Sequence, residues 1–199
     1  MGRKGEAYST STLLEFTSSL KPAQKDRLVS QGEILSSLVF ENQCYQQHIK
    51  AHACTPTETG IITDDNYGQA QVLQMNTMWI LPYLKESNVV IVPGFNGLSM
   101  SGRITTLGRG GSNKTAVLLA TALEVEHVEI FTDVDGIYDQ DPKFNEKSQK
   151  YQTLSHDQCL DLIHAGSYVM MEESVELAKK TELILQLPPF FREFWYKSD

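Results

Sequence analysis

Residues 105–113 read Thr-Thr-Leu-Gly-Arg-Gly-Gly-Ser-Asn and run directly into a segment whose apolar residues recur with helical spacing. Glycines let a backbone approach a ligand closely, and a helix start offers unpaired N–H groups and the positive end of its dipole. Arg109 carries a guanidinium suited to carboxylate or phosphate, and Ser112 is placed to cap the helix. The stretch is neither a P-loop nor a dinucleotide fingerprint, so by itself it indicates either an anion site or an ordinary turn.

Helical and strand-like patterns alternate on both sides of this stretch. The β-branched run within residues 88–94, closed by Pro-Gly, is typical of a buried strand in a parallel sheet. The alternation predicts an α/β fold with a mainly parallel central sheet. Strands are predicted at residues 50–54, 88–94, 128–132 and 183–185, and helices at 11–20, 24–47 with an interruption near Gly32, 68–84, 113–123, 155–164 and 172–180.

A second polar segment follows the predicted strand at 128–132. Residues 132–138 read Thr-Asp-Val-Asp-Gly-Ile-Tyr, and Asp-Pro-Lys follows at 141–143. Ligands of α/β proteins usually bind where parallel strands deliver their carboxyl ends. An aspartate there can bind ribose, backbone amides or a metal-bound phosphate, although an Asp-rich turn is also common in ordinary loops.

Composition narrows the class of protein. The 199 residues suffice for one domain or two small lobes. A formal charge of -8 argues against nucleic-acid and anionic-membrane partners, which need a basic face. The longest apolar stretch, 72–84, is too short to span a membrane, and no signal core follows the basic N-terminus. Three cysteines without C-x-x-C spacing predict reduced thiols in a cytoplasmic protein.

Cys44, His48, His52 and Cys54 lie close in sequence and raise the alternative of a zinc site. Strand alternation would place His48, Lys50, His52 and Cys54 along one strand, which is a poor tetrahedral arrangement. The sequence therefore predicts no metal site built from protein ligands alone.

Taken in order, these segments resemble the aspartokinase branch of the amino-acid kinase family. The resemblance runs from residue 1 to about Leu187, and its most specific blocks are 105–112 and 132–138. It implies a three-layer α/β/α kinase fold with a substrate lobe at residues 1–102, a nucleotide-binding lobe at 103–187 and a tail at 188–199. Further matching segments are residues 1–10, 32–33, 60–64, 93–97 and 174–178.

The resemblance also implies a reaction. Aspartokinases transfer the γ-phosphoryl group of ATP, with Mg²⁺, to the side-chain carboxylate of L-aspartate, in the biosynthesis of lysine, threonine and methionine. By resemblance, Glu33 would hold the aspartate amine, while Arg109 and Ser112 would hold its carboxylates. The catalytic set would be Arg109, Ser112 and Asn113, and the nucleotide-binding set would be Thr132, Asp133, Tyr138 and Lys143.

The sequence departs from the family pattern at several charged positions. The family opens with a strand ending in Lys-Phe-Gly-Gly, whereas this sequence begins at the Met-Gly-Arg segment that follows, and it stops before the usual regulatory domains. Asn113 stands where the family has aspartate, Gly-Ser-Tyr at 166–168 replaces Gly-Ala-Lys, and Met-Glu-Glu at 171–173 replaces His-Pro-Arg. Each lost cation is expected to lower the rate by roughly 10²–10³.

Three functions follow from this combination. The first hypothesis is an aspartokinase-like protein, or pseudoenzyme, that binds ATP but phosphorylates aspartate poorly or not at all. Alternatively, the chain is a non-catalytic subunit that completes a partner kinase, or a truncated product of a conventional active aspartate kinase. Absent central strands would leave apolar edges open, which favours a homo- or hetero-oligomer.

Overall fold

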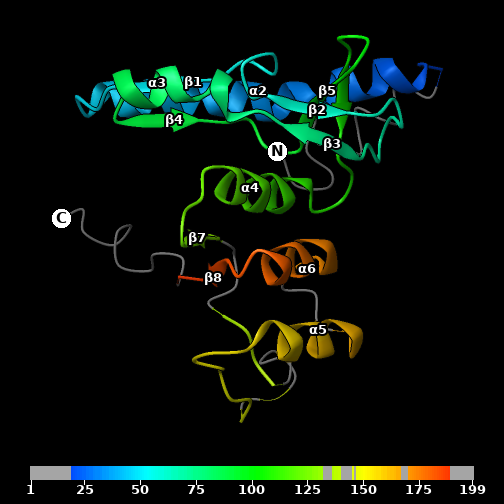
Figure 1. The fold of residues 1–199 in the computed structure, drawn as a ribbon, viewed down its shortest axis with the longest axis vertical. Helices are drawn as coiled ribbons and strands as arrows, with labels where there is room; N and C mark the ends of the chain where they lie inside the picture. The colour runs from blue at the N-terminus through cyan, green and yellow to red at the C-terminus, as the bar shows by residue number, and fades with distance from the viewer. Residues whose placement is uncertain (1–18, 132–135, 140–144, 146, 167–169, 189–199) are drawn as a thin grey trace. The chain divides into compact units, whose positions relative to one another are not determined.

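The computed structural model describes residues 19–131, 136–139, 145, 147–166 and 170–188. They form two compact units that divide between Thr115 and Ala116, within one helix. The predicted lobe boundary at residue 102 concerns which ligand each part binds, and it stays a prediction. Both units contain helices and strands (Figure 1).

The first unit contains two sheets covered by a long helix. Strands β1 and β4 pair in parallel, and a four-stranded sheet has the order β3-β2-β5-β6. Helix α2 contacts β1, β4 and β6. The elements in chain order are α2 (Pro22–Gln46), β1 (Ala51–Ala53), β2 (Ile61–Thr63), β3 (Val72–Met75), the 3₁₀ helix η1 (Thr77–Trp79), α3 (Leu81–Glu86), β4 (Val89–Ile91), β5 (Asn96–Ser99), β6 (Ile104–Thr106) and the start of α4 (Gly111–Ala122).

The second unit packs the rest of α4 with two further helices and a parallel strand pair. Strands β7 (His127–Glu129) and β8 (Ile184–Gln186) run in parallel, and α5 (His156–His164) and α6 (Glu172–Lys180) lie between them in sequence. Its core has two clusters. The first contains Val117, Ala120, Ala178 and Leu183, and the second contains Ile130, Met170 and Val175.

The predicted fold class is confirmed. Three of the five strand pairings within the described residues are parallel, namely β1–β4, β2–β5 and β7–β8. The helix at 172–180 and the helix beginning near residue 113 form as predicted, because each has an apolar face to bury. Strands also form within the predicted segments 50–54 and 88–94.

Two predicted elements were wrong. Helix α2 continues through Gly32 without interruption, because its packing on three strands outweighs the cost of one glycine. Residues 68–84 form β3, η1 and α3 instead of one helix. Pro82 stands in the first turn of α3, where a proline is tolerated, so it begins a helix that it was expected to end. The predicted helix at 11–20 lies mostly outside the described residues, as does most of the tail.

The cysteines and histidines considered for zinc do not lie along one strand. Cys44 is buried on α2, and His48 lies beyond that helix with φ of 60° instead of on the predicted strand. His52 stacks on Tyr83 with ring centroids 3.7 Å apart. Burial and the nearby carboxylates of Glu58 and Glu41 raise the pKa of the Cys54 thiol to about 11, so it stays protonated. Within the described residues, no group of three His, Cys, Asp or Glu side chains is arranged to hold a metal.

None of the helices in the described ranges is both long and apolar enough to cross a bilayer.

A polar contact joins the two neighbouring helices of the second unit. His164, in the last turn of α5, lies 2.7 Å from the Glu172 carboxylate at the start of α6. The hydrogen bond and charge of Glu172, with smaller effects of Asp161 and Glu176, raise the pKa of His164 above its usual value. The charged pair therefore stabilises the folded state fully below about pH 6.5, and this stabilisation is lost as pH rises through the raised pKa.

The substitution His164→Gln is expected to remove this part of the pH dependence of stability. In the wild type, the Tm should fall as pH rises above about 6.5, and the variant should show a flatter profile over the same range. Thermal unfolding of both proteins between about pH 5.5 and 8.5 measures the Tm at each pH. His127→Gln, at an exposed position of β7, is the matched control. A His164→Gln profile with the wild-type slope would contradict the prediction.

Candidate functional site

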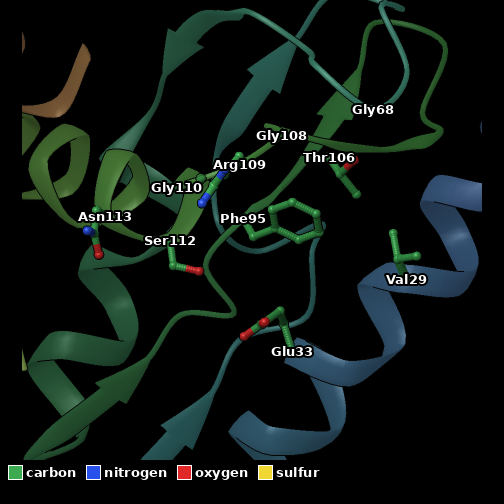
Figure 2. A pocket seen from close by; sticks show the side chains of 11 residues that line it. Val29, Glu33, Gly68, Phe95, Thr106, Gly108, Arg109, Gly110, Ser112 and Asn113 are labelled. Carbon is green, nitrogen blue, oxygen red and sulfur yellow. The ribbon is translucent and has the colours of Figure 1, made fainter. Parts of the chain in front are cut away.

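A pocket of about 470 Å³ lies between α2 and the turn that joins β6 to α4 (Figure 2). This volume is within the range of small-molecule sites. Its walls combine Val29 and Glu33 from α2, Phe95 before β5, and the glycine-rich turn, with Gly68 and Thr106 completing it. All of these residues belong to the first unit.

The glycine-rich turn gives the pocket one wall. Gly108 and Gly110 have φ values of 78° and 73°, a left-handed conformation that glycine adopts without strain. The turn closes by a hydrogen bond of 3.1 Å from the Gly111 N–H to the Gly108 carbonyl. Helix α4 begins at Gly111, so Ser112 lies in its first turn, and the prediction of Ser112 as the N-cap was wrong. The hydroxyl of Ser112 still reaches the pocket, beside Asn113.

Oppositely charged side chains stand on the two walls. Figure 2 shows Glu33 on α2 across the pocket from Arg109 and Ser112. No ion pair joins Glu33 to Arg109, and neither side chain has a hydrogen-bond partner within the described residues. The pocket therefore presents an acceptor carboxylate and a donor guanidinium that are both available to a ligand.

Phe95 is a wall residue to which the sequence gave no role. Its φ of 70° is rare for a residue with a side chain, and two contacts hold it. The Phe95 N–H donates to Thr115 Oγ1 at 3.1 Å, and its carbonyl accepts from the Leu107 N–H at 2.9 Å. The half-buried ring thus forms an apolar wall beside the charged groups. The sequence feature that could have identified Phe95 is the matching segment Pro-Gly-Phe-Asn-Gly at 93–97.

Only part of the predicted nucleotide set can be located. Thr132, Asp133 and Lys143 lie outside the described residues. Tyr138 belongs to the second unit and forms an antiparallel bridge with Lys150. The pairing continues with a hydrogen bond of 2.9 Å from the Tyr151 N–H to the Ile137 carbonyl.

Lys150 is a second residue that the sequence analysis missed. Its stem crosses Gly136, where an added Cβ would lie 2.2 Å from Lys150 Cε and 3.0 Å from Nζ. A lysine therefore lies against the turn predicted to bind nucleotide. No spacing rule connects residue 150 with residue 136, so only the fold identifies this contact.

The site residues therefore separate into two groups. Glu33, Arg109, Ser112 and Asn113, which the sequence predicted to bind substrate or act in catalysis, line one pocket. Tyr138 lies in the other unit, beside Lys150.

Comparisons with known proteins agree on one family. The model of the Amino acid kinase family matches residues 5–185. Aspartokinase 1 of Bacillus subtilis (strain 168) is 32% identical over 191 residues, which are 94% of this chain and 47% of that protein. The aspartokinase of Helicobacter pylori (strain ATCC 700392 / 26695) is 38% identical over 180 residues, covering 88% of this chain and 44% of that protein.

Among solved structures, E. coli aspartokinase III in complex with aspartate and ADP superposes with a TM-score of 0.77 at 30% identity. The match covers 89% of this chain and 41% of that one. This chain thus spans less than half the length of the aspartokinases it matches.

Proposed function

Because this chain belongs to the amino acid kinase family, we propose that its pocket between α2 and the glycine-rich turn binds L-aspartate and that its second unit binds ATP. The finer roles of single residues are part of this proposal. It rests on the geometry of the pocket and on the aspartate and ADP held by the similar E. coli enzyme.

The observation that carries the proposal is the placement of unpaired opposite charges across one small pocket. L-aspartate has one ammonium group and two carboxylates. Glu33 supplies a carboxylate suited to the ammonium, and Arg109 can bind a carboxylate through two parallel N–H donors. Ser112 adds a hydroxyl, and the N-terminus of α4 adds the positive end of the helix dipole. A neutral or purely anionic ligand would leave Glu33 desolvated without a partner.

The reaction implied by the family forms a bond between a side-chain carboxylate oxygen of aspartate and the γ-phosphorus of ATP. The bond from that phosphorus to the ADP oxygen breaks, and ADP leaves. Such transfers depend on positioning and charge neutralisation more than on a covalent nucleophile. Arg109 and Ser112 would orient aspartate, and Lys150 would add a positive charge beside the nucleotide turn.

Mg²⁺ would neutralise charge on the phosphates. It retains waters and usually binds through one or two carboxylates and phosphate oxygens.

We further propose that phosphoryl transfer is slow. Asn113 keeps the shape of an aspartate without its charge, Tyr168 replaces a lysine, and Glu172 and Glu173 bring acidic groups to a segment that is basic in the family. The lysine replaced by Tyr168 and the basic residue lost at 171–173 are two missing cations. Each is worth roughly 10²–10³ in rate, so together they would lower turnover by about 10⁴–10⁶.

Calorimetry and a coupled assay with the purified chain test both parts. L-aspartate and Mg²⁺·ADP are each expected to bind, while turnover with aspartate, ATP and Mg²⁺ stays far below the about 10 s⁻¹ typical of enzymes. Absence of aspartate binding would contradict the assignment of the pocket. Turnover near the typical value would leave that assignment intact and contradict the impairment.

A further inference from the structure

A buried carboxylate on α2 lies behind the pocket and has no part in the function proposed above. Asp26 is only 4% exposed. Its Oδ2 accepts two backbone hydrogen bonds, one of 2.9 Å from the Gly68 N–H and one of 2.8 Å from the Thr106 N–H. A carboxylate that accepts backbone N–H groups in a buried setting makes strong, charge-assisted hydrogen bonds.

The two donors belong to segments that both line the pocket. Thr106 ends β6, which is the last strand of its sheet, and its carbonyl accepts from the Ala70 N–H at 2.9 Å. Gly68 also touches the glycine-rich turn, since an added Cβ on Gly108 would lie 3.1 Å from the Gly68 carbonyl oxygen. Asp26 therefore holds the 68–70 loop and the end of β6 together, directly before the turn that carries Arg109.

Asp26 also fixes α2 relative to that turn. Asp26, Val29 and Glu33 follow each other at helical spacings of three and four, so they share one face of α2. Val29 and Glu33 on this face line the pocket. Seven residues of helix span about 10 Å, so an anchored Asp26 sets where the Glu33 carboxylate stands opposite Arg109.

We propose that Asp26 is a positioning residue for amino-acid binding, which sets the separation between Glu33 and the glycine-rich turn through its two backbone hydrogen bonds. This inference rests on the proposed aspartate site and adds a residue to it. Asp26 touches no ligand and acts through the elements that it joins.

Four variants of the full chain test the proposal by calorimetry with L-aspartate and, separately, with Mg²⁺·ADP. Asp26→Ala is expected to weaken aspartate binding about tenfold or more, because it leaves the Gly68 and Thr106 N–H groups without their acceptor and releases the two segments that carry them. Asp26→Asn keeps an acceptor oxygen and should restore most of the affinity. Asp26→Glu keeps the charge but displaces the oxygens by one methylene, so it should still bind aspartate several-fold more weakly. Ser30→Ala, on the same buried face, is the control.

The ADP measurement separates positioning from general destabilisation. Affinity for ADP, assigned to the second unit, should stay unchanged in every variant that folds. Wild-type aspartate affinity in either Asp26→Ala or Asp26→Glu would overturn the proposal, as would an equal loss of both ligands. If Asp26→Ala does not fold, Asp26→Glu still decides between these outcomes.

Hydrogen exchange distinguishes failure of this inference from failure of the proposed function. If the wild type binds no aspartate, the proposed function is wrong, yet the two backbone hydrogen bonds to Asp26 can still be examined. The amides of Gly68 and Thr106 should exchange faster in Asp26→Ala than in Asp26→Asn. Unchanged exchange of both amides would overturn the role of Asp26.

Discussion

Replacing Gly60 with alanine is expected to lower the free energy of unfolding by about 2–5 kcal/mol. Gly60 has φ of 70°, a conformation that costs a residue with a Cβ roughly 1–2 kcal/mol. A Cβ there would lie 2.0 Å from the carbonyl oxygen of Asn76, so the backbone must move. That movement breaks the 2.9 Å hydrogen bond from the Asn76 N–H to the Gly60 carbonyl, at a further cost of about 1–3 kcal/mol.

Gly102→Ala is the matched control for this substitution. Gly102 has nearly the same φ, 74°, but an added Cβ there has no atom within 4 Å. Its cost should be limited to the backbone term of about 1–2 kcal/mol. Denaturant unfolding of both variants measures the difference. Equal destabilisation of the two variants would mean that the clash with Asn76 adds nothing to the backbone cost.

The sequence predicted best the elements that bury an apolar face by themselves. Helix α4 and helix α6 follow from the spacing of their own residues, and so does β4 from its run of valine and isoleucine. The prediction of one helix at 68–84 failed because the apolar residues there fit both the helical period and the strand period. Val72–Met75 form a strand because they pair with β2, and a local sequence pattern does not reveal such a pairing.

The residues of the site also differ in how far the sequence alone predicts them. The glycine-rich turn and the Gly-Glu pair at 32–33 are recognisable as motifs, so Glu33 and Arg109 were predicted and lie in one pocket. Asp26 was not predicted, because a charged residue on a helix normally faces solvent. Its acceptor role depends on Thr106, which lies 80 residues away, and only the fold brings the two together.

Replacing Arg109 with methionine is expected to weaken binding of L-aspartate about 100-fold, equivalent to about 2.7 kcal/mol. The guanidinium is proposed to hold a ligand carboxylate, and hydrogen bonds to charged groups are worth about 1.5–3 kcal/mol. Arg109 is exposed and unpaired within the described residues, so the folded state should lose at most about 0.5 kcal/mol. Calorimetry with L-aspartate, alongside denaturant unfolding, measures both quantities.

Two companion variants make the role of the guanidinium specific. Arg109→Lys keeps the charge but loses the planar pair of donors, so its affinity should fall between those of the wild type and Arg109→Met, about tenfold from each. Arg103→Met removes an exposed arginine from the same unit, outside the pocket lining, and should leave aspartate binding unchanged. If Arg109→Met binds aspartate as the wild type does, then Arg109 does not hold the ligand carboxylate. If Arg103→Met weakens binding equally, the effect comes from the net charge of the unit instead of from contact in the pocket.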